Sequence, residues 1–147
     1  MSNRMFSVSG ISASGMAAER RRMEIVANNI ANANSTHGPD GQPFRRQHLI
    51  FATAKDSEGS PTGNSNALRG VRILGIGSDD SEFPELYIPG HPDANEQDMV
   101  RMPNVKLPNE MVDLITASRS YEANLKALTV FKEMIEQTLS LLRGGRE

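Results

Sequence analysis

Apolar residues recur at helical spacing near the N-terminal end of the chain. From about Met5 to Ala33, one face collects five of them at intervals of seven, three, four and three positions: Met16, Met23, Val26, Ile30 and Ala33. This spacing predicts an amphipathic helix. We expect the helix to end at the turn-forming residues that follow Ala33. Gly10 and Gly15 should weaken its first turns, because glycine costs about 1 kcal/mol relative to alanine.

A longer pattern of the same kind runs from Asn109 to Arg143. Ten positions follow in steps of three and four, and all but two are apolar or aromatic: Met111, Leu114, Ser118, Tyr121, Leu125, Leu128, Lys132, Ile135, Leu139 and Leu142. Other apolar residues widen this face: Val112, Ile115, Val130, Phe131, Met134 and Leu141. We predict a helix with Asn109 as its N-cap and Gly144-Gly145 at its end. At 1.5 Å per residue it would be roughly 50 Å long, so part of its apolar face needs a partner.

Helical periodicity disappears between the two helices. Two short runs favour β-strands, Phe44 to Ala52 and Val71 to Ile76. The stretch between them, Lys55 to Asn66, is rich in serine, glycine and asparagine and is typical of a mobile loop. Tyr87 to Val105 contains a Pro-Gly-His-Pro sequence, and we interpret it as an irregular extended crossing.

Together these zones predict a mainly α fold. Antiparallel N- and C-terminal helices would form an elongated, coiled-coil-like domain, with a small middle insertion that contains a β-hairpin. The expected division is 1–34 for the N-terminal helix, 35–108 for the middle β/extended segment and 109–147 for the C-terminal helix. Two interpretations remain open: an ordinary helical hairpin with a β insertion, and a helical pair that packs beside copies or relatives in a tube.

The composition favours burial between subunits over a large core within one. Apolar residues make up 37% of the 147 residues and aromatics 5%, whereas about 45–50% apolar is usual when glycine is counted. The net charge of −2 gives no global argument for nucleic acid or anionic lipid. The N-terminus lacks the pattern of a secretory signal, and no stretch is apolar enough over sufficient length to span a membrane. Export would therefore need another route.

Residues that carry catalytic or metal chemistry form no convincing constellation. The absence of cysteine excludes disulfides, thiolate metal sites and a cysteine nucleophile. The three histidines share no zinc-binding spacing, and no serine nucleophile elbow occurs. Asp93 to Asn104 departs from a calcium loop at Asp98, where that loop has glycine, and at Asn104, where it has glutamate. A structural turn is the better interpretation, and we expect no enzyme activity, metal or cofactor.

Arg20-Arg21-Arg22 and Arg45-Arg46 are the basic clusters of the chain. Consecutive residues point in different directions around a helix, so a solvated or lightly paired surface is favoured over contact with nucleic acid. A basic patch facing an acidic neighbour in an assembly stays open. A salt titration of association would separate these cases, because phosphate binding weakens steeply with salt.

Four asparagines lie at the end of the N-terminal helix: Asn28, Asn29, Asn32 and Asn34. Asparagine is a poor helix former, and Asn28 and Asn32 share one face. Such a helix end can hydrogen-bond an adjacent extended backbone, while the intervening alanines allow close approach. The alternatives are contact with other segments or subunits and a frayed, capped helix end.

These motifs resemble those of the bacterial flagellar axial proteins, which include rod and hook proteins. Ser14-Gly15-Met16 followed by Val26 to Asn34 is similar to the N-terminal helix motif of that family, and the C-terminal helix resembles its second terminal helix. Four ordered segments are similar to proximal-rod members in particular: Pro89–Ala94, Val100–Val105, Glu110–Ile115 and Ala117–Asn124. The turn at Asn95 to Met99 departs from the family's aspartate- and glycine-rich pattern. The 55–66 loop and the basic tail after Leu142 also diverge.

The resemblance implies a structural subunit of the proximal rod of the flagellar basal body. Such a subunit would be exported through the flagellar type III apparatus to the periplasmic rod. Its implied partners are further copies of itself, the sister rod proteins FlgB, FlgF and FlgG, and the adaptor FliE. Together they would transmit torque and surround the export channel. A non-polymerising coiled-coil binding or adaptor protein is the alternative. A peptidoglycan-active enzyme is more distant, because no pair of catalytic carboxylates can be placed.

The assembly interface is expected on the two terminal helices. Its positions combine the apolar stripes with the asparagine-rich helix end: Met16, Met23, Val26, Asn28, Asn29, Ile30, Asn32, Met111, Leu114, Tyr121, Leu125, Leu128, Ile135 and Leu139.

Overall fold

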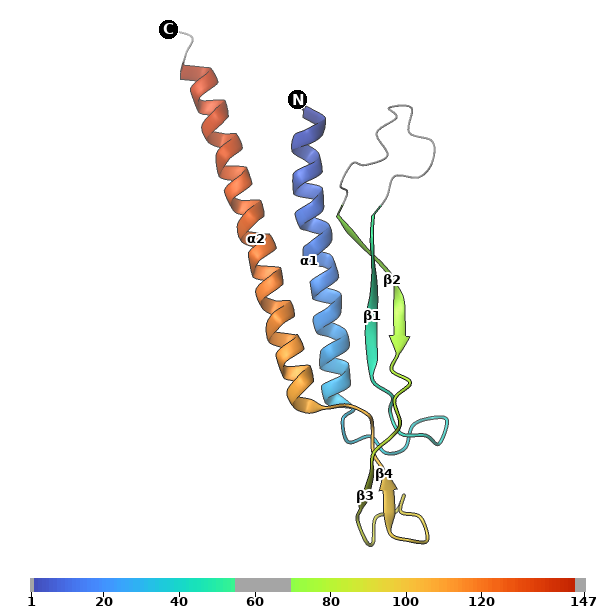
Figure 1. Cartoon of the computed structure of the whole chain (residues 1–147). Coiled ribbons are helices and arrows are strands. Elements are labelled where there is room, and N and C mark those ends of the chain that lie inside the picture. Colours follow the sequence, from blue (N-terminus) through green and yellow to red (C-terminus); the bar gives the residue numbers. More distant parts are fainter. Residues whose placement is uncertain (1, 55–69, 145–147) are drawn as a thin grey trace, which may run out of the picture. The chain divides into compact units, whose positions relative to one another are not determined.

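A computed structural model of the chain describes residues 2–54 and 70–144. The elements follow in the order α1 (Ser2–Ala31), β1 (Gln47–Thr53), β2 (Val71–Ser78), β3 (Glu85–Tyr87), β4 (Met99–Arg101) and α2 (Leu107–Gly144), as Figure 1 shows. The fold is mainly helical with a small strand-containing middle segment, which confirms the predicted class at that level. The loop predicted at 55–66 and residues 145–147 of the tail lie outside the described residues.

The chain divides into two compact units. Unit 1 contains the described residues of Met1–Arg20, Phe51–Ile73 and Ser118–Glu147, and unit 2 contains Arg21–Ile50 and Leu74–Ala117. Among the described residues, few apolar side chains are buried. In unit 2 they include Ile25, Val26, Val100 and Ala117, and in unit 1 Ala18. This thin core agrees with the low apolar content of the sequence.

The N-terminal helix starts earlier and ends earlier than its sequence pattern predicts. α1 covers Ser2–Ala31, and residues 32–34 form a turn. Its two interior glycines have different surroundings within unit 1. A Cβ at Gly10 would meet nothing within 4 Å, whereas a Cβ at Gly15 would lie 3.1 Å from the side-chain amide of Asn124 on α2. Gly15 therefore makes room for a neighbouring side chain, while Gly10 only lowers helix propensity.

The predicted N-cap at Asn109 is wrong, because α2 already begins at Leu107. The main-chain N–H groups of Asn109 and Glu110 both donate to the carbonyl of Lys106, at 2.9 and 3.1 Å. Pro108 is tolerated in this first turn because its missing N–H would have no partner there. Glu110 places a carboxylate near the positive end of the helix dipole.

β1 and β2 pair in a two-stranded sheet. In unit 1 the N–H of Ala54 donates to the carbonyl of Gly70, and in unit 2 the N–H of Asp79 donates to the carbonyl of Arg46. Each bond joins one end of β1 to the opposite end of β2, so the strands run antiparallel. Both predicted strands exist, with different bounds. β1 begins three residues later than predicted and ends one residue later, and β2 begins as predicted but ends two residues later.

β3 and β4 form a second antiparallel pair, in which Leu86 lies opposite Val100. The predicted irregular crossing from Tyr87 to Val105 is therefore wrong in part, because strands of three residues are too short to show an alternating pattern. Within the 88–98 connection, the Asn95 side chain accepts the N–H groups of Gln97 and Met99 at 2.9 and 3.0 Å. Asp98 adopts a positive φ of 59°. The structural turn predicted here is what the residues form.

Candidate functional site

Glu110, on the first turn of α2, is one of two completely buried polar residues among the described residues of unit 2; the other is Asn29. Glu110 is 0% exposed, and both of its carboxylate oxygens have partners. Oε1 accepts a hydrogen bond from Nε of Arg46 at 2.5 Å, and Oε2 accepts one from Nδ2 of Asn29 at 2.9 Å. A carboxylate can be buried in this way because a cation and a fixed amide replace its water.

Asn29 joins the end of α1 to the start of β1. Its Oδ1 accepts the N–H of Gln47 at 3.0 Å, and its Nδ2 donates to the carbonyl of Gln47 at 2.8 Å. The side-chain amide thus takes the place of a neighbouring strand and satisfies both main-chain groups of one strand residue. The sequence predicted that an asparagine here would bond an extended backbone. Asn29 makes that contact, whereas Asn28 and Asn32 bond to each other.

Arg46 connects the first strand to the start of α2. Besides its bond to Glu110, its guanidinium donates to Oδ2 of Asp113 at 3.2 Å, and its main-chain N–H donates to Oδ1 of Asn104 at 2.7 Å. The planar fork of arginine suits it to hold two carboxylates at once. The expectation of a solvated or lightly paired surface at Arg45-Arg46 is therefore wrong. Arg45 also packs, with its guanidinium 4.3 Å from the centre of the Phe83 ring.

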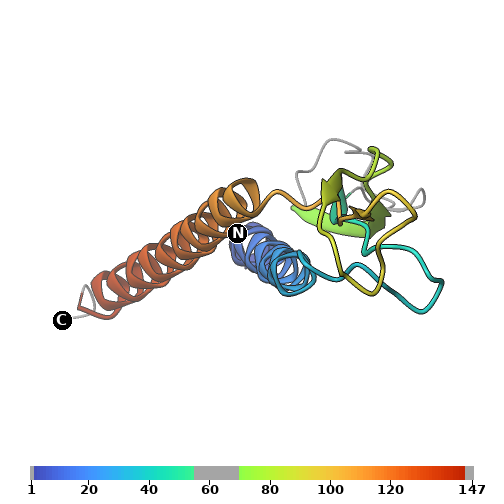
Figure 2. The ribbon, with the colours of Figure 1, turned by 90° about the horizontal axis from the view of Figure 1, so that it is seen from below.

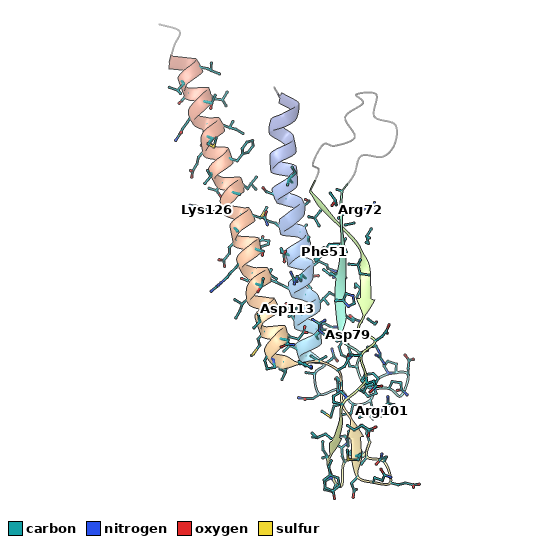
Figure 3. All side chains as sticks on the ribbon, in the orientation of Figure 1. Phe51, Arg72, Asp79, Arg101, Asp113 and Lys126 are labelled. Carbon is teal, nitrogen blue, oxygen red and sulfur yellow. The ribbon has the colours of Figure 1, made fainter. Side chains whose placement is uncertain are left out.

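Asn104 extends the network to the chain just after β2. Its Nδ2 donates to the carbonyl of Asp79 at 2.9 Å and to the hydroxyl of Ser81 at 2.9 Å. The N–H and the hydroxyl of Ser81 hold the pKa of the Asp79 carboxyl below its usual range, with a smaller contribution from Arg46. Figure 3 labels Asp79 after β2 and Asp113 on the first turns of α2. We call Asn29, Arg46, Asn104 and Glu110 together the polar clasp.

The polar clasp draws its residues from four parts of unit 2. Figure 2 shows the 32–46 connection, which leaves the end of α1 and leads to β1. Arg46 is the last residue before β1. An open groove of about 560 Å³ borders the polar clasp, and its lining combines charged, amide and hydroxyl groups: Arg46, Asp79, Ser81, Asn104, Lys106, Asn109, Val112 and Asp113. Among the described residues, no three His, Asp or Glu side chains gather as a metal site would require. The clasp binds segments of its own chain together.

Unit 1 contains a smaller polar contact between α1 and β2. The hydroxyl of Ser14 donates to the carbonyl of Ile11 at 2.7 Å and accepts the N–H of Val71 at 3.1 Å. Gly70, with a φ of +90°, lies so close that a Cβ there would be 2.1 Å from this hydroxyl oxygen. Ser14 and Gly15 belong to one sequence motif but make different contacts. Ser14 bonds the strand β2, and Gly15 packs against Asn124 on α2.

The predicted interface residues fall into three groups in this structure: buried, exposed and partly exposed. Asn29 and Val26 are buried within unit 2, whereas Met111, Leu125 and Leu139 are exposed. Asn28 is also exposed. The remaining positions are partly exposed: Met16, Met23, Ile30, Asn32, Leu114, Tyr121, Leu128 and Ile135. The buried pair therefore supports the subunit's own fold, and the exposed residues leave apolar surface uncovered.

Sequence reasoning missed the roles of Arg46, Asn104 and Glu110. For Glu110 a signal existed, because extending the apolar stripe of α2 backwards from Leu114 by four positions lands on it. A carboxylate on a buried stripe requires a donor. Arg46 and Asn104 carry no comparable local pattern.

No helix among the described residues combines the length and apolar content needed to cross a membrane. A family model described as "Flagella basal body rod protein" matches residues 11–39, and one described as "Flagellar basal body rod FlgEFG protein C-terminal" matches residues 96–141. The first match covers Asn29 on α1. The second covers Asn104, which follows β4, and Glu110 on α2. Both matches point to the rod proteins of the bacterial flagellum as a class.

Curated relatives narrow this class. The flagellar basal-body rod protein FlgC of Borreliella burgdorferi is 38% identical over 150 residues, covering 95% of this chain and 99% of its own. FlgC of Yersinia enterocolitica is 39% identical, covering 93% and 97%. FlgC of Aquifex aeolicus is 42% identical, covering 91% and 94%. The chain belongs to the FlgC family of flagellar basal-body rod proteins. It is a structural subunit of the basal-body rod and not an enzyme.

Proposed function

We propose that this subunit assembles through its terminal helices into the proximal rod, where it transmits torque and surrounds the export channel. Its partners are FlgB, FlgF and FlgG, the adaptor FliE and further copies of itself. The rod lies in the periplasm, and the subunit reaches it through the flagellar type III apparatus. The observation that carries the proposal is the exposed apolar surface of α2.

Ten of the eighteen large apolar side chains that are exposed in the described part of the chain lie on α2. Met111, Val112 and Ile115 are 58, 63 and 55% exposed in unit 2, and in unit 1 Met134 and Leu141 are 58 and 77% exposed. A monomeric soluble protein rarely leaves so much apolar surface in one region, and such surface marks sites of association. Covering it would supply the burial that the small cores lack.

The exposed residues of α2 occupy more than one face. Within unit 1, Tyr121, Leu128 and Ile135 are partly covered and follow one stripe. Val130 is nine positions from Tyr121 and so points about 180° away at 100° per residue. Leu141 points in nearly the same direction as Val130. A single neighbouring helix covers only one such stripe, so we propose that α2 has one partner in its own subunit and another outside it.

We further propose that the helices pair antiparallel in a coiled-coil-like terminal domain formed by residues 1–34 and 109–147, with 35–108 as the middle segment. The assembly interface then comprises the fourteen positions named from the sequence. The exposed residues among them would contact the neighbouring subunits directly. Asn29 and Val26 would act indirectly, because they are buried within unit 2.

A charge in the exposed stripe tests the proposal. Leu125→Asp should abolish motility by blocking rod growth, because assembly would bury a carboxylate without a partner. Lys126→Asp changes the charge on the same turn, at the position labelled in Figure 3, outside the predicted seam, and serves as the control. Cells that swim normally with Leu125→Asp would overturn the claim that this stripe is an interface. Co-sedimentation of the purified subunit with FlgB, FlgF and FlgG distinguishes a polymerising subunit from an adaptor.

Hydrogen exchange on the dilute subunit gives a second test. The ends of α1 and α2 in unit 1 should exchange quickly, since apolar seams that order only on assembly recover the ordering entropy at that step. Amides around the polar clasp should be better protected. Two helices that are well protected over their whole length in a stable monomer would contradict the proposal.

A further inference from the structure

We infer that Asn29, Arg46 and Glu110 specify the conformation of this subunit more than they stabilise it, and so act as positioning residues for assembly. The link to assembly rests on the proposed function. The claim about conformation concerns the isolated chain alone.

Apolar packing does not fix which residues of α1 meet the start of α2. Ala27 to Asn34 repeats alanine and asparagine in close alternation, so a shift of three residues along the helix exchanges Asn29 for Asn32. The first turns of α2 leave Met111 and Ile115 exposed. Small, similar side chains on one side and uncovered ones on the other permit several packings of similar energy.

The buried carboxylate removes this ambiguity. Each oxygen of Glu110 has one donor, Arg46 on Oε1 and Asn29 on Oε2. A shift of α1 by four residues would put Ile25 or Ala33 in the place of Asn29, and neither side chain can bond Gln47 or Glu110. Misplacement then leaves one buried carboxylate oxygen of Glu110 and the two main-chain groups of Gln47 without these donors and acceptors, which is a large penalty. A polar group on an otherwise apolar interface fixes register in this way.

The strand is fixed by the same residues. Asn29 bonds both main-chain groups of Gln47, and Asn104 receives the N–H of Arg46. A slip of β1 by one residue would reverse which side chains face each side of the sheet and would carry Arg46 away from Glu110. The bonds join residues 18, 64 and 81 positions apart in the sequence. One small cluster thus sets the relation of three distant segments of unit 2.

The Arg46–Glu110 ion pair could act mainly by fixing the conformation or mainly by stabilising the fold. These two roles predict opposite effects when both residues are replaced by apolar ones. Removing one charge strands the other, whereas replacing both with residues of similar volume is often neutral or stabilising. We therefore compare Glu110→Leu with the double variant Arg46→Met and Glu110→Leu. The control is Lys132→Met with Glu136→Leu, which removes an exposed ion pair on α2. All are measured by urea unfolding and by exchange of the Gln47 amide in the isolated subunit.

Glu110→Leu should lower the folding equilibrium constant by about 100-fold or more, and the double variant should recover to within about 10-fold of the parent. In the double variant, the Gln47 amide should nevertheless exchange at least about 10-fold faster than in the parent, and co-sedimentation with FlgB, FlgF and FlgG should be lost. The control should leave unfolding and the exchange rate unchanged.

Two results would overturn the inference. A double variant that is as unstable as Glu110→Leu, or does not fold, means that the pair stabilises the fold. A double variant with the parent's Gln47 exchange rate and normal co-sedimentation means that apolar packing alone sets the register. If the parent itself fails to co-sediment, the proposed function fails, while the exchange and unfolding data still decide the inference.

Discussion

Replacing the buried amide of Asn29 with a carboxylate changes one group of atoms and tests how the polar clasp contributes to folding. In Asn29→Asp, an oxygen replaces the nitrogen that donates to the Gln47 carbonyl at 2.8 Å and to Glu110 at 2.9 Å. Both bonds become contacts between acceptors, and two carboxylates face each other at a residue that is 0% exposed. Each buried group left unsatisfied costs about 1–3 kcal/mol, and more when it is charged.

We therefore expect Asn29→Asp to lower the free energy of unfolding by about 3–5 kcal/mol at neutral pH. For a protein of this length, each kcal/mol lowers the melting temperature by about 2–4 °C, so the melting temperature should fall by roughly 6–20 °C. Thermal and urea unfolding followed by circular dichroism measures both quantities. Asn28→Asp is the matched control, because Asn28 is exposed and its change should cost less than about 1 kcal/mol.

The sign of the pH dependence sharpens this test. Burial beside Glu110 should raise the pKa of the carboxyl introduced by Asn29→Asp above its value in the unfolded chain. The difference in stability between variant and parent should then shrink as the pH falls from 7 towards about 5, because the introduced carboxyl, once protonated, again donates a hydrogen bond. An Asn29→Asp variant as stable as Asn28→Asp at neutral pH would show that the clasp carries little energy. A deficit independent of pH would show that the loss does not come from burying a second ionised carboxylate.

Three further predictions concern residues that do not belong to the polar clasp: Gly10, Gly70 and Asp79. Gly10→Ala should raise the free energy of unfolding by up to about 1 kcal/mol in urea unfolding, because the site is open and helical; a loss would mean that α1 is not helical there. Gly70→Ala should lower it by about 2 kcal/mol or more, because a Cβ would overlap the Ser14 hydroxyl and strain a φ of +90°; the double variant with Ser14→Gly should recover only part of the loss. Asp79 has a lowered pKa in the folded state, so its contribution is present above the unfolded pKa and disappears as the pH falls through the lower folded value. Asp79→Asn should therefore flatten the stability profile as the pH falls through the acid range in which carboxyl groups titrate, and an unchanged acid slope in urea unfolding would contradict this.

The helices and the class of fold could be predicted because their signals are local. Stripes that include Met23 and Val26, or Tyr121 and Leu128, repeat at the helical period and need no tertiary information. The two glycines of α1 had the same effect on that prediction, yet Gly15 serves a contact with Asn124 and Gly10 does not. That difference depends on a residue at the far end of the sequence, which no local pattern contains.

The polar clasp lay beyond prediction for the same reason. Asn29 could be singled out from its unusual place at a helix end, but its partners come from β1 and α2. Arg46 looked like part of a solvated basic pair, because two adjacent arginines carry no sign of burial. Its environment follows from Glu110, 64 positions later. The short β3 and β4 were missed because three residues give too few positions to establish a period of two.

In this subunit, different side chains select the conformation and provide the energy of association. Polar residues such as Asn29 and Glu110 are buried and bonded within the subunit, whereas large apolar residues such as Met111 and Leu141 are exposed. A stable monomer would show the opposite arrangement. For a subunit that must join neighbours, directional bonds inside can select one conformation, and non-directional apolar surface outside can then provide the energy of association once partners arrive. An apolar surface without a fixed conformation would bind in many registers. On this reasoning, variants of the clasp should impair the accuracy of assembly, and variants of the α2 surface its strength.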